Sequence, residues 1–340
     1  MKIAVIGASG AVGKEIITLL ETRCFPVKSL RCFASPRSLG KTISFKGEQI
    51  PLEVLAPFDA DLSFFAAGAA ISKEWIPKTK GISIDSSSAF RESAPLIIPE
   101  INADALSLPV IASPNCVVTI LLMPLAPLHR RYRIKRIVTS TYQAASGGGA
   151  HLLKHLEEET GALLQGKRIP TTLPYPYAFN VFPHTSELHP NGYVGEELKI
   201  LHEARKILGD PTIAISATCV RVPVLRAHSI SANVEFHHPF DLDEAIEAVR
   251  TMPGVTLFED RANNRFATPF DATGKNEIFC GRFRIDPSQP NTLEFWAVGD
   301  QLLKGAALNA VQIGELLSLG NQRHKGGDVG EFKIGREIAL

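Results

Sequence analysis

The sequence is poor in cysteine and lacks the closely spaced cysteine pairs of a disulfide framework or a zinc ribbon. Its five cysteines are odd in number, lie far apart and form no Cys-x-x-Cys motif. Small secreted domains held by disulfides and cysteine-rich zinc sites usually carry even, clustered sets. We therefore expect a reduced, cytoplasmic protein in which the cysteines are thiols: Cys24, Cys32, Cys116, Cys219 and Cys280.

An excess of one charge is also missing. The 36 Lys and Arg residues nearly balance the 35 Asp and Glu residues. No long-range field therefore favours nucleic acid or an anionic membrane surface. We expect neither as a partner, and any anion must be bound at a local site.

Long apolar runs are absent as well. Four apolar residues follow Met1-Lys2 and lead at once into glycines, which is not the pattern of a signal peptide. The longest later run, 117–128, contains two prolines and is too short to cross a bilayer. The sequence therefore predicts no membrane association.

The part of the chain up to about residue 116 alternates short apolar strands with helical stretches. Such a rhythm is typical of βαβ units in a parallel sheet. With 340 residues and 45% hydrophobic composition, the chain is long enough for two domains. In this first part we expect a helix at 13–22 and strands at 3–7, 29–34, 62–66, 82–85 and 109–112.

Beyond Cys116 the strands become longer and more alternating, which favours a mostly antiparallel sheet with helices on one face. We expect strands at 134–142, 213–222, 228–236 and 292–298, and helices at 149–160, 195–208 and 242–250. A further amphipathic helix at about 302–320 could pack back on the first domain. The predicted domains are 1–116 with this helix, 117–301, and a polar tail at 321–340.

The segment Gly7-Ala8-Ser9-Gly10-Ala11-Val12-Gly13 joins the first strand to the first helix. Glycines at this place let the backbone turn sharply and approach a pyrophosphate at the helix N-terminus. The spacing G-x-x-G-x-x-G is a variant of the usual fingerprint, and a purely structural turn is the alternative. The sequence thus predicts a Rossmann-type dinucleotide-binding domain whose turn supplies Gly7, Ser9, Gly10, Ala11, Val12 and Gly13.

The end of the second predicted strand lacks the carboxylate that binds the ribose 2′-hydroxyl in NAD-dependent proteins. It continues instead into Ser35-Pro36-Arg37-Ser38. A guanidinium and hydroxyls suit a 2′-phosphate, so Arg37 and Ser38 favour NADP. The alternative is that Arg37 is a solvated surface cation.

Cys116 follows Ser113-Pro114-Asn115 and precedes an apolar, helix-compatible run. A thiol at a helix N-terminus has a lowered pKa, which makes Cys116 the candidate nucleophile, whereas a buried inert thiol is the default for the other four. A cysteine that works with a nicotinamide indicates one chemistry. The thiolate adds to an aldehyde, the hemithioacetal loses hydride, and a thioester remains for an acyl acceptor.

Four motifs occur in a fixed order along nearly the whole chain, and together they resemble the aspartate-semialdehyde dehydrogenase family. They are the turn at 7–13, Ser113-Pro114-Asn115-Cys116, Thr141-Tyr142-Gln143-Ala144-Ala145-Ser146-Gly147, and Arg221-Val222-Pro223-Val224-Leu225-Arg226-Ala227-His228, with Gly195-Glu196-Glu197-Leu198-Lys199 between the last two.

The resemblance implies NADPH-dependent reduction of β-aspartyl phosphate to aspartate β-semialdehyde and phosphate, a step toward lysine (through diaminopimelate), threonine and methionine. By position, Cys116 matches the family's nucleophile and His228 its general acid/base. Gln143 matches a residue that orients the substrate, and Arg221 matches the arginine that holds the substrate carboxylate. The resemblance also implies a homodimer or homotetramer that assembles through the sheet of the second domain.

Further positions follow from the same resemblance. Glu196 matches the residue that meets the substrate amine, and the positions around the transferring phosphate are Lys199, Arg91 and Asn115. Ser146 and Gly147 match backbone near the nicotinamide. One departure is that Val117 and Val118 stand where many bacterial members carry a hydroxyl residue after the cysteine.

Physical objections accompany some of these assignments. In one strand, positions 221 and 228 face opposite sides unless Pro223 breaks the alternation. Glu196 and Lys199, at i and i+3, could instead form a surface ion pair, and His228 could be a core histidine. His151 and His155 have a metal-like spacing without a third ligand, so we expect no metal site.

Two rival functions remain open. N-acetyl-γ-glutamyl-phosphate reductase also pairs a nucleotide turn with a cysteine and a histidine, but its cysteine usually follows Asn-Pro-Gly. The chain could also be a non-catalytic NADP-binding sensor, because the turn alone does not fix a function. The joint presence of Cys116, Gln143, Arg221 and His228 argues against both.

Overall fold

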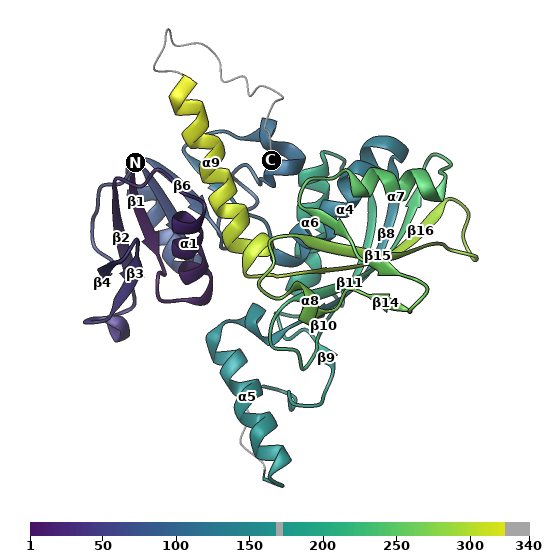
Figure 1. Cartoon of the computed structure of the whole chain (residues 1–340), viewed down its shortest axis with the longest axis horizontal. Helices are drawn as coiled ribbons and strands as arrows, with labels where there is room; N and C mark the ends of the chain where they lie inside the picture. The colour runs from purple at the N-terminus through teal and green to yellow at the C-terminus, as the bar shows by residue number, and fades with distance from the viewer. Residues whose placement is uncertain (168–172, 324–340) are drawn as a thin grey trace. The chain divides into compact units, whose positions relative to one another are not determined.

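The chain is divided into two compact units. The computed structural model describes residues 1–167 and 173–323. Met1–Asn115 and the segment that begins at Ala306 form the first unit, and Cys116–Gly305 forms the second. In Figure 1 the first unit contains the purple strands and the yellow helix α9.

The first unit is built on a seven-stranded sheet in the order β3-β4-β2-β1-β5-β6-β7. All neighbouring strands are parallel except β3 and β4, which form a hairpin. Because β2 and β5 lie on opposite sides of β1, the strand order changes direction here, and open sheets of this kind bind ligands at such a point. The strands are β1 (Lys2–Ile6), β2 (Ser29–Ala34), β3 (Thr42–Phe45), β4 (Glu48–Val54), β5 (Leu62–Phe65), β6 (Ile82–Asp85) and β7 (Val110–Ala112).

Helices flank this sheet. The last of them, α9 (Leu308–Arg323), follows a π-helical turn at Leu303–Ala307 and packs against α1 and α3. The other helices of the unit are α1 (Ala11–Thr22), α2 (Ala69–Trp75) and α3 (Pro99–Asn102). Helix α9 thus extends three residues beyond the expected helix end at residue 320, and residues 324–340 of the expected tail lie outside the described part.

The second unit is built on another seven-stranded sheet, in the order β12-β15-β16-β11-β8-β10-β9. Neighbours are antiparallel except β8 with β10 and β12 with β15. The strands are β8 (Ile134–Gln143), β9 (Phe182–Pro183), β10 (Ala214–Arg221), β11 (His228–Phe236), β12 (Val255–Leu257), β15 (Ile278–Ile285) and β16 (Thr292–Gly299). A small hairpin joins β13 (Glu259–Asp260) to β14 (Arg265–Phe266).

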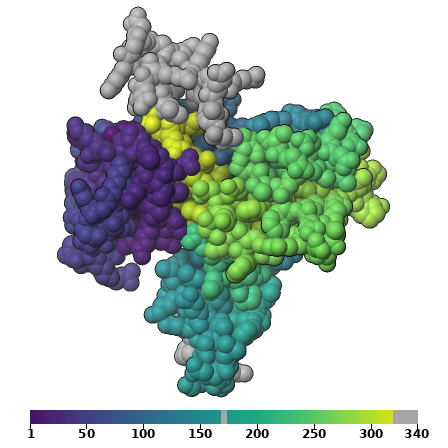
Figure 2. All heavy atoms as spheres, in the orientation of Figure 1, coloured from purple at the N-terminus to yellow at the C-terminus, as the bar shows by residue number. Residues whose placement is uncertain are grey.

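Three helices pack on this sheet, namely α4 (Cys116–Tyr132), α6 (Gly195–Leu208) and α7 (Leu242–Arg250) (Figure 1). Helix α5 (Ala150–Leu164) projects away from the sheet (Figures 1 and 2), and α8 (Pro269–Ala272) contacts β16. Along β8, Thr139, Thr141 and Gln143 are buried, whereas Ser140 and Tyr142 are half-buried. The sheet thus has one face under helices and one more open face.

The fold class expected from the sequence is confirmed, with a mainly parallel sheet in the first unit and a mainly antiparallel sheet in the second. Strands β2, β6 and β11 and helices α6 and α7 have the expected bounds. Strands β3, β4 and β15 were not expected from the sequence. Among the described residues no helix is long and apolar enough to cross a membrane.

Candidate active site

The glycine-rich turn after β1 is shaped by its own backbone. Gly7 has a φ of 89°, in the left-handed region that glycine tolerates. A Cβ atom on Gly7 would lie 2.6 Å from the carbonyl oxygen of Ala66, and one on Gly13 would lie 2.2 Å from that of Gly7. Folding of the turn therefore requires glycine at both positions, whether or not a ligand is present.

Helix α1 offers its N-terminus directly after this turn. Ser9 and Gly10 precede the helix, and Ala11, Val12 and Gly13 are its first residues. No side chain caps this helix end, and its first turn contains no acidic residue. Because the first N–H groups of a helix lack partners within the helix, this end is suited to an anion such as a phosphate.

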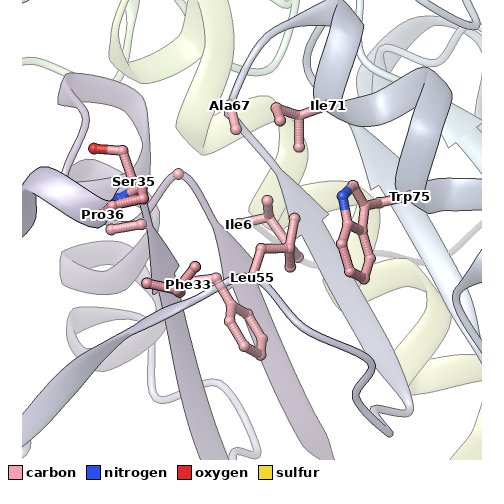
Figure 3. A pocket seen from close by; sticks show the side chains of 11 residues that line it. Ile6, Phe33, Ser35, Pro36, Leu55, Ala67, Ile71 and Trp75 are labelled. Carbon is pink, nitrogen blue, oxygen red and sulfur yellow. The ribbon is translucent and has the colours of Figure 1, made fainter. Parts of the chain in front are cut away.

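A mainly apolar cavity of about 350 Å³ lies beside the turn, within the first unit. Figure 3 shows Ser35 and Pro36 on one side of it and Ile71 and Trp75 on the other. Ile6, Leu55 and Phe33 lie between them. Such walls suit a flat aromatic ring. The Ser38 hydroxyl donates a hydrogen bond to the Ser9 hydroxyl at 3.2 Å, and the exposed Arg37 precedes Ser38. An apolar slot and phosphate-binding groups are therefore adjacent.

In the second unit, three predicted site residues lie on one face of the sheet. Gln143, at the end of β8, pairs with Arg221 at the end of β10. Strand β11 runs antiparallel to β8 and pairs Ile230 with Thr141. Because side chains alternate along a strand, His228 points to the same face as Gln143. That face is the one under the helices.

The geometric objection to Arg221 and His228 rests on a wrong premise. The two residues do not share a strand, because Arg221 ends β10 and His228 begins β11, and these strands lie on opposite sides of β8. Residues 222–227, which include Pro223, only connect them. Alternation along one strand therefore does not separate the two side chains, and no strand break at Pro223 is needed.

Ala144, the residue after β8, makes backbone hydrogen bonds to the side chains of both His228 and Arg221. Its N–H donates to His228 Nδ1 at 3.0 Å, and its carbonyl oxygen accepts from Arg221 Nη1 at 3.1 Å. A neutral imidazole that accepts at Nδ1 carries its proton on Nε2. One residue of backbone thus fixes the histidine ring and the guanidinium relative to each other.

His228 is completely buried, and its Nε2 has no hydrogen-bond partner in the described structure. Burial lowers the pKa of His228 to about 3, and the nearby positive charge of Arg221 adds to this effect. The ring is therefore neutral at physiological pH. A buried polar atom without a partner at such a place is a candidate for contact with a reactant.

Glu196, in the first turn of α6, completes this group. It is 5% exposed, and its carboxylate accepts from Gln143 Nε2 at 3.1 Å and pairs with Lys199 Nζ at 2.8 Å. The expected alternative of a simple surface ion pair does not describe it, because the carboxylate is buried and is also bonded to the sheet. The structure thus brings together Gln143, Glu196, Lys199, Arg221 and His228.

Cys116 is the first residue of α4 and is partly exposed. A Cβ atom on Gly305 would lie 3.0 Å from the Cys116 Cβ, so this glycine leaves room for the cysteine. One turn further along α4, Ile120 packs against Gly299, which pairs with His228 across β11 and β16. The first turn of α4 therefore lies over the end of the sheet that carries His228.

The other cysteines have different environments. Burial raises the pKa of Cys32 and of Cys219 to about 12, and it also raises the pKa of Cys280. These three are therefore thiols at neutral pH. Cys24 is exposed, and it lies in the turn that follows α1. Within the described chain, which includes all five, no disulfide forms.

Two predicted phosphate-site residues belong to the first unit. Arg91 donates to the carbonyl oxygens of Ser113 and Ser86, each at 3.1 Å. It thereby fixes the segment that leads to the buried Asn115. Of the predicted residues near the nicotinamide, Ser146 accepts a hydrogen bond from Gln301 Nε2, and Gly147 lies against the His228 ring.

Gly147 offers a direct test of the space around His228. A Cβ atom at residue 147 would lie 2.8 Å from both Cε1 and Nε2 of the ring. On the sequence-based assignment of His228 as the general acid/base, we expect Gly147→Ala to displace the ring and lower kcat by about 10-fold or more. Steady-state kinetics check this. The matched control is Gly161→Ala in α5, where an added Cβ meets nothing within 4 Å; equal kcat values for the two variants would contradict the prediction.

His184 also belongs to this group, although no feature of the sequence indicated it. Its Nε2 lies 2.8 Å from Arg221 Nη2. No spacing motif signals this residue, because it reaches Arg221 only through the pairing of β9 with β10. Among the described residues, no group of three or more His, Cys, Asp or Glu side chains is arranged to hold a metal ion.

Comparison with known proteins gives matches over most of the chain. The model for the semialdehyde dehydrogenase NAD binding domain matches residues 2–108, and the model for the semialdehyde dehydrogenase dimerisation domain matches residues 125–304. The aspartate-semialdehyde dehydrogenase of Synechocystis sp. is 47% identical over 329 residues, which cover 93% of this chain and 97% of that protein. The chain belongs to the aspartate-semialdehyde dehydrogenase family.

Other aspartate-semialdehyde dehydrogenases are similar to the chain in sequence and in structure. The Bacillus subtilis enzyme is 38% identical, with 93% of this chain and 97% of that protein covered. The crystal structure of aspartate semialdehyde dehydrogenase II from Vibrio cholerae has a TM-score of 0.90 at 36% identity and covers 94% of this chain and 98% of that one. The chain is therefore an NAD(P)-dependent oxidoreductase of amino-acid biosynthesis.

Proposed function

We propose that the chain reduces β-aspartyl phosphate to aspartate β-semialdehyde, reversibly and with NADPH, through a thioester on Cys116. The observation that carries this proposal is the buried group on one sheet face, where a carboxylate and a guanidinium flank a neutral histidine. These three groups are complementary to a substrate that carries an amine, a carboxylate and a reactive carbonyl.

Each polar side chain would bind a different group of the substrate. Arg221 would bind the α-carboxylate, because a guanidinium matches a carboxylate with two parallel hydrogen bonds. Glu196 would meet the α-amine, and Gln143, bonded to Glu196, would orient the carbonyl. The cation Lys199 would bind the phosphate that leaves or attacks; for Arg91 and Asn115, which belong to the first unit, this role is what the sequence resemblance implies.

The chemistry needs a nucleophile and a group that exchanges protons. The Cys116 thiolate attacks the carbonyl carbon of the acyl phosphate, the carbon–oxygen bond to phosphate breaks, and a thioester forms. The bound nicotinamide supplies hydride in this direction and accepts it in the reverse. The Nε2–H of the neutral His228 ring would donate to the carbonyl oxygen as negative charge develops there in the hemithioacetal, and Nε2 would take the proton back when the hemithioacetal collapses.

The activity is tested in the reverse direction by following the absorbance of reduced cofactor with aspartate semialdehyde, NADP and phosphate. We expect steady turnover with all three reactants. Without phosphate, we expect at most one equivalent of reduced cofactor per site, because the thioester then has no acceptor. A pure wild-type protein that gives no turnover with all three would refute the proposed function.

For the cofactor we propose NADP(H) rather than NAD(H). The absence of a carboxylate after β2, the exposed Arg37 and the Ser38–Ser9 hydroxyl pair support a 2′-phosphate at this edge. Trp75 and the other walls of the apolar cavity would hold the adenine. We further propose that the first unit binds the cofactor and that the second binds the substrate.

Arg37→Ala should weaken the binding of NADPH but not that of NADH. We expect KM for NADPH to rise about 10–100-fold, the effect of losing a charge-assisted hydrogen bond, with no change in KM for NADH. Initial rates with each cofactor measure this. The control is Lys28→Ala, an exposed cation just before the other end of β2. A rise in both KM values, or in neither, would show that Arg37 does not bind the 2′-phosphate.

For the assembly we propose a homodimer or a tetramer built from such dimers. The open face of the second sheet supports this, because it carries half-buried side chains such as Tyr142, Ser231 and Trp296. The Tyr142 and Trp296 rings lie 5.4 Å apart on it. Aromatic side chains of this kind are enriched at protein interfaces.

A further inference from the structure

His184 lies between the carboxylate-binding arginine and the start of α6. It directly follows β9, and its backbone N–H donates to the Cys219 carbonyl oxygen at 2.8 Å. Its Nε2 lies 2.8 Å from Arg221 Nη2, and its Nδ1 lies 3.1 Å from the Ser186 hydroxyl oxygen. Both ring nitrogens therefore have a side-chain partner.

The partners fix the tautomer of this ring. A guanidinium is a donor only, so Nε2 must accept from Arg221 and the proton must be on Nδ1. The opposite tautomer would place two N–H donors against each other at 2.8 Å. The backbone N–H of Ser186 also points at Nδ1, at 3.2 Å, so either tautomer leaves one donor facing another. The Arg221 contact is the shorter of the two and is charged, so it decides the tautomer, and Nδ1–H donates to the Ser186 hydroxyl at 3.1 Å.

The chain of hydrogen bonds continues to α6. The Ser186 hydroxyl accepts from the backbone N–H of Glu196 at 3.0 Å. Arg221 and Glu196 are thus joined through His184 and Ser186. These are the two residues that carry the proposed carboxylate and amine sites.

The charge state of His184 agrees with the role of an acceptor. Burial, together with the Arg221 and Lys199 charges and against the opposing charge of Glu196, lowers the pKa of His184 to about 4. The ring is neutral at physiological pH, so it does not repel the guanidinium. It also gives Arg221 a second fixed contact, in addition to the Ala144 carbonyl oxygen.

These contacts leave part of the guanidinium for a ligand. Arg221 is 7% exposed, and its Nε has no hydrogen-bond partner in the described structure. A buried N–H without a partner costs free energy, which a bound carboxylate would recover. We propose that His184 is a positioning residue that holds Arg221 ready for the substrate α-carboxylate and sets its separation from Glu196. This rests on the proposed function of Arg221.

The test compares His184→Leu with His184→Gln. Leucine removes the acceptor, whereas the glutamine Oε1 can reach the place of Nε2. We expect His184→Leu to raise KM for aspartate semialdehyde about 10–100-fold, with kcat within about 3-fold of wild type and an unchanged KM for NADP. His184→Gln should recover most of the loss. The control His202→Leu, an exposed histidine on α6, should match wild type.

A substrate without the α-carboxylate separates positioning from general damage. For 3-aminopropanal, which keeps the amine and the aldehyde, we expect equal kcat/KM for wild type and His184→Leu. In an Arg221→Ala background, His184→Leu should have no further effect on KM for aspartate semialdehyde. A loss with 3-aminopropanal as large as with aspartate semialdehyde, or no recovery by glutamine, would overturn the proposal. An inactive wild type would instead refute the proposed function.

Discussion

Cys116→Ala should reduce turnover of aspartate semialdehyde by at least about 10⁴-fold, because removal of a covalent nucleophile leaves only the contribution of binding. The position supports this expectation, since Cys116 is the first residue of α4 and is partly exposed. Its backbone N–H and those of the next residues form the positive end of the helix dipole, where a thiolate is stabilised. Stopped-flow measurement of reduced NADP measures the loss.

The control variants are Cys24→Ser and Cys280→Ala. Cys24 is exposed, and burial raises the pKa of Cys280, so neither has the environment of a nucleophile. Both variants should keep kcat within about 3-fold of wild type. Wild type incubated with aspartate semialdehyde and NADP, without phosphate, should carry one acyl group on Cys116 by mass spectrometry. Full turnover by Cys116→Ala would remove Cys116 from the mechanism.

The main elements of both sheets were predictable because their sequence patterns are local. Strands β2 and β11 and helix α6 have apolar residues at the spacing of their element, with clear breaks at the ends. The β3–β4 hairpin was missed because its turn, Lys46-Gly47, lacks the usual Asn-Gly or Asp-Gly signal, although both residues have positive φ. Strand β15 was missed because its pairing with β16 shifts between Gly281 and Arg284.

The site was only partly predictable from the sequence, for a physical reason. Gln143, Glu196, Arg221 and His228 were chosen by motif, but their contacts depend on strand pairing. The parallel pairing of β8 with β10 is formed by chain segments far apart, and it brings Arg221 beside Gln143. His184 gave no signal, since only the short β9 edge strand carries it to Arg221. The role of Ala144 was equally hidden, because it acts through its backbone.

His228→Asn is expected to fold and bind cofactor but to turn over at least about 10²-fold more slowly, the usual size of an acid/base contribution. Asparagine keeps a polar group that can face the Ala144 N–H, but it exchanges no proton near neutral pH. Steady-state kinetics measure the loss, and a cofactor titration confirms binding. His202→Asn, at an exposed position on α6, is the control and should match wild type.

Because the pKa of His228 is low, the pH dependence of stability and of kcat distinguishes wild type from His228→Asn. In the folded protein the ring stays neutral down to about pH 3, whereas in the unfolded chain it takes up a proton near pH 6.5. Between these values the unfolded state binds more protons, so wild type should lose stability relative to His228→Asn as pH falls from 6.5 toward 4. Over pH 5–8 the ratio of the two kcat values should stay constant, because the ring does not change charge. A ratio that collapses below pH 6.5, or an unchanged kcat in His228→Asn, would show that a neutral, buried His228 is not the group that moves the proton.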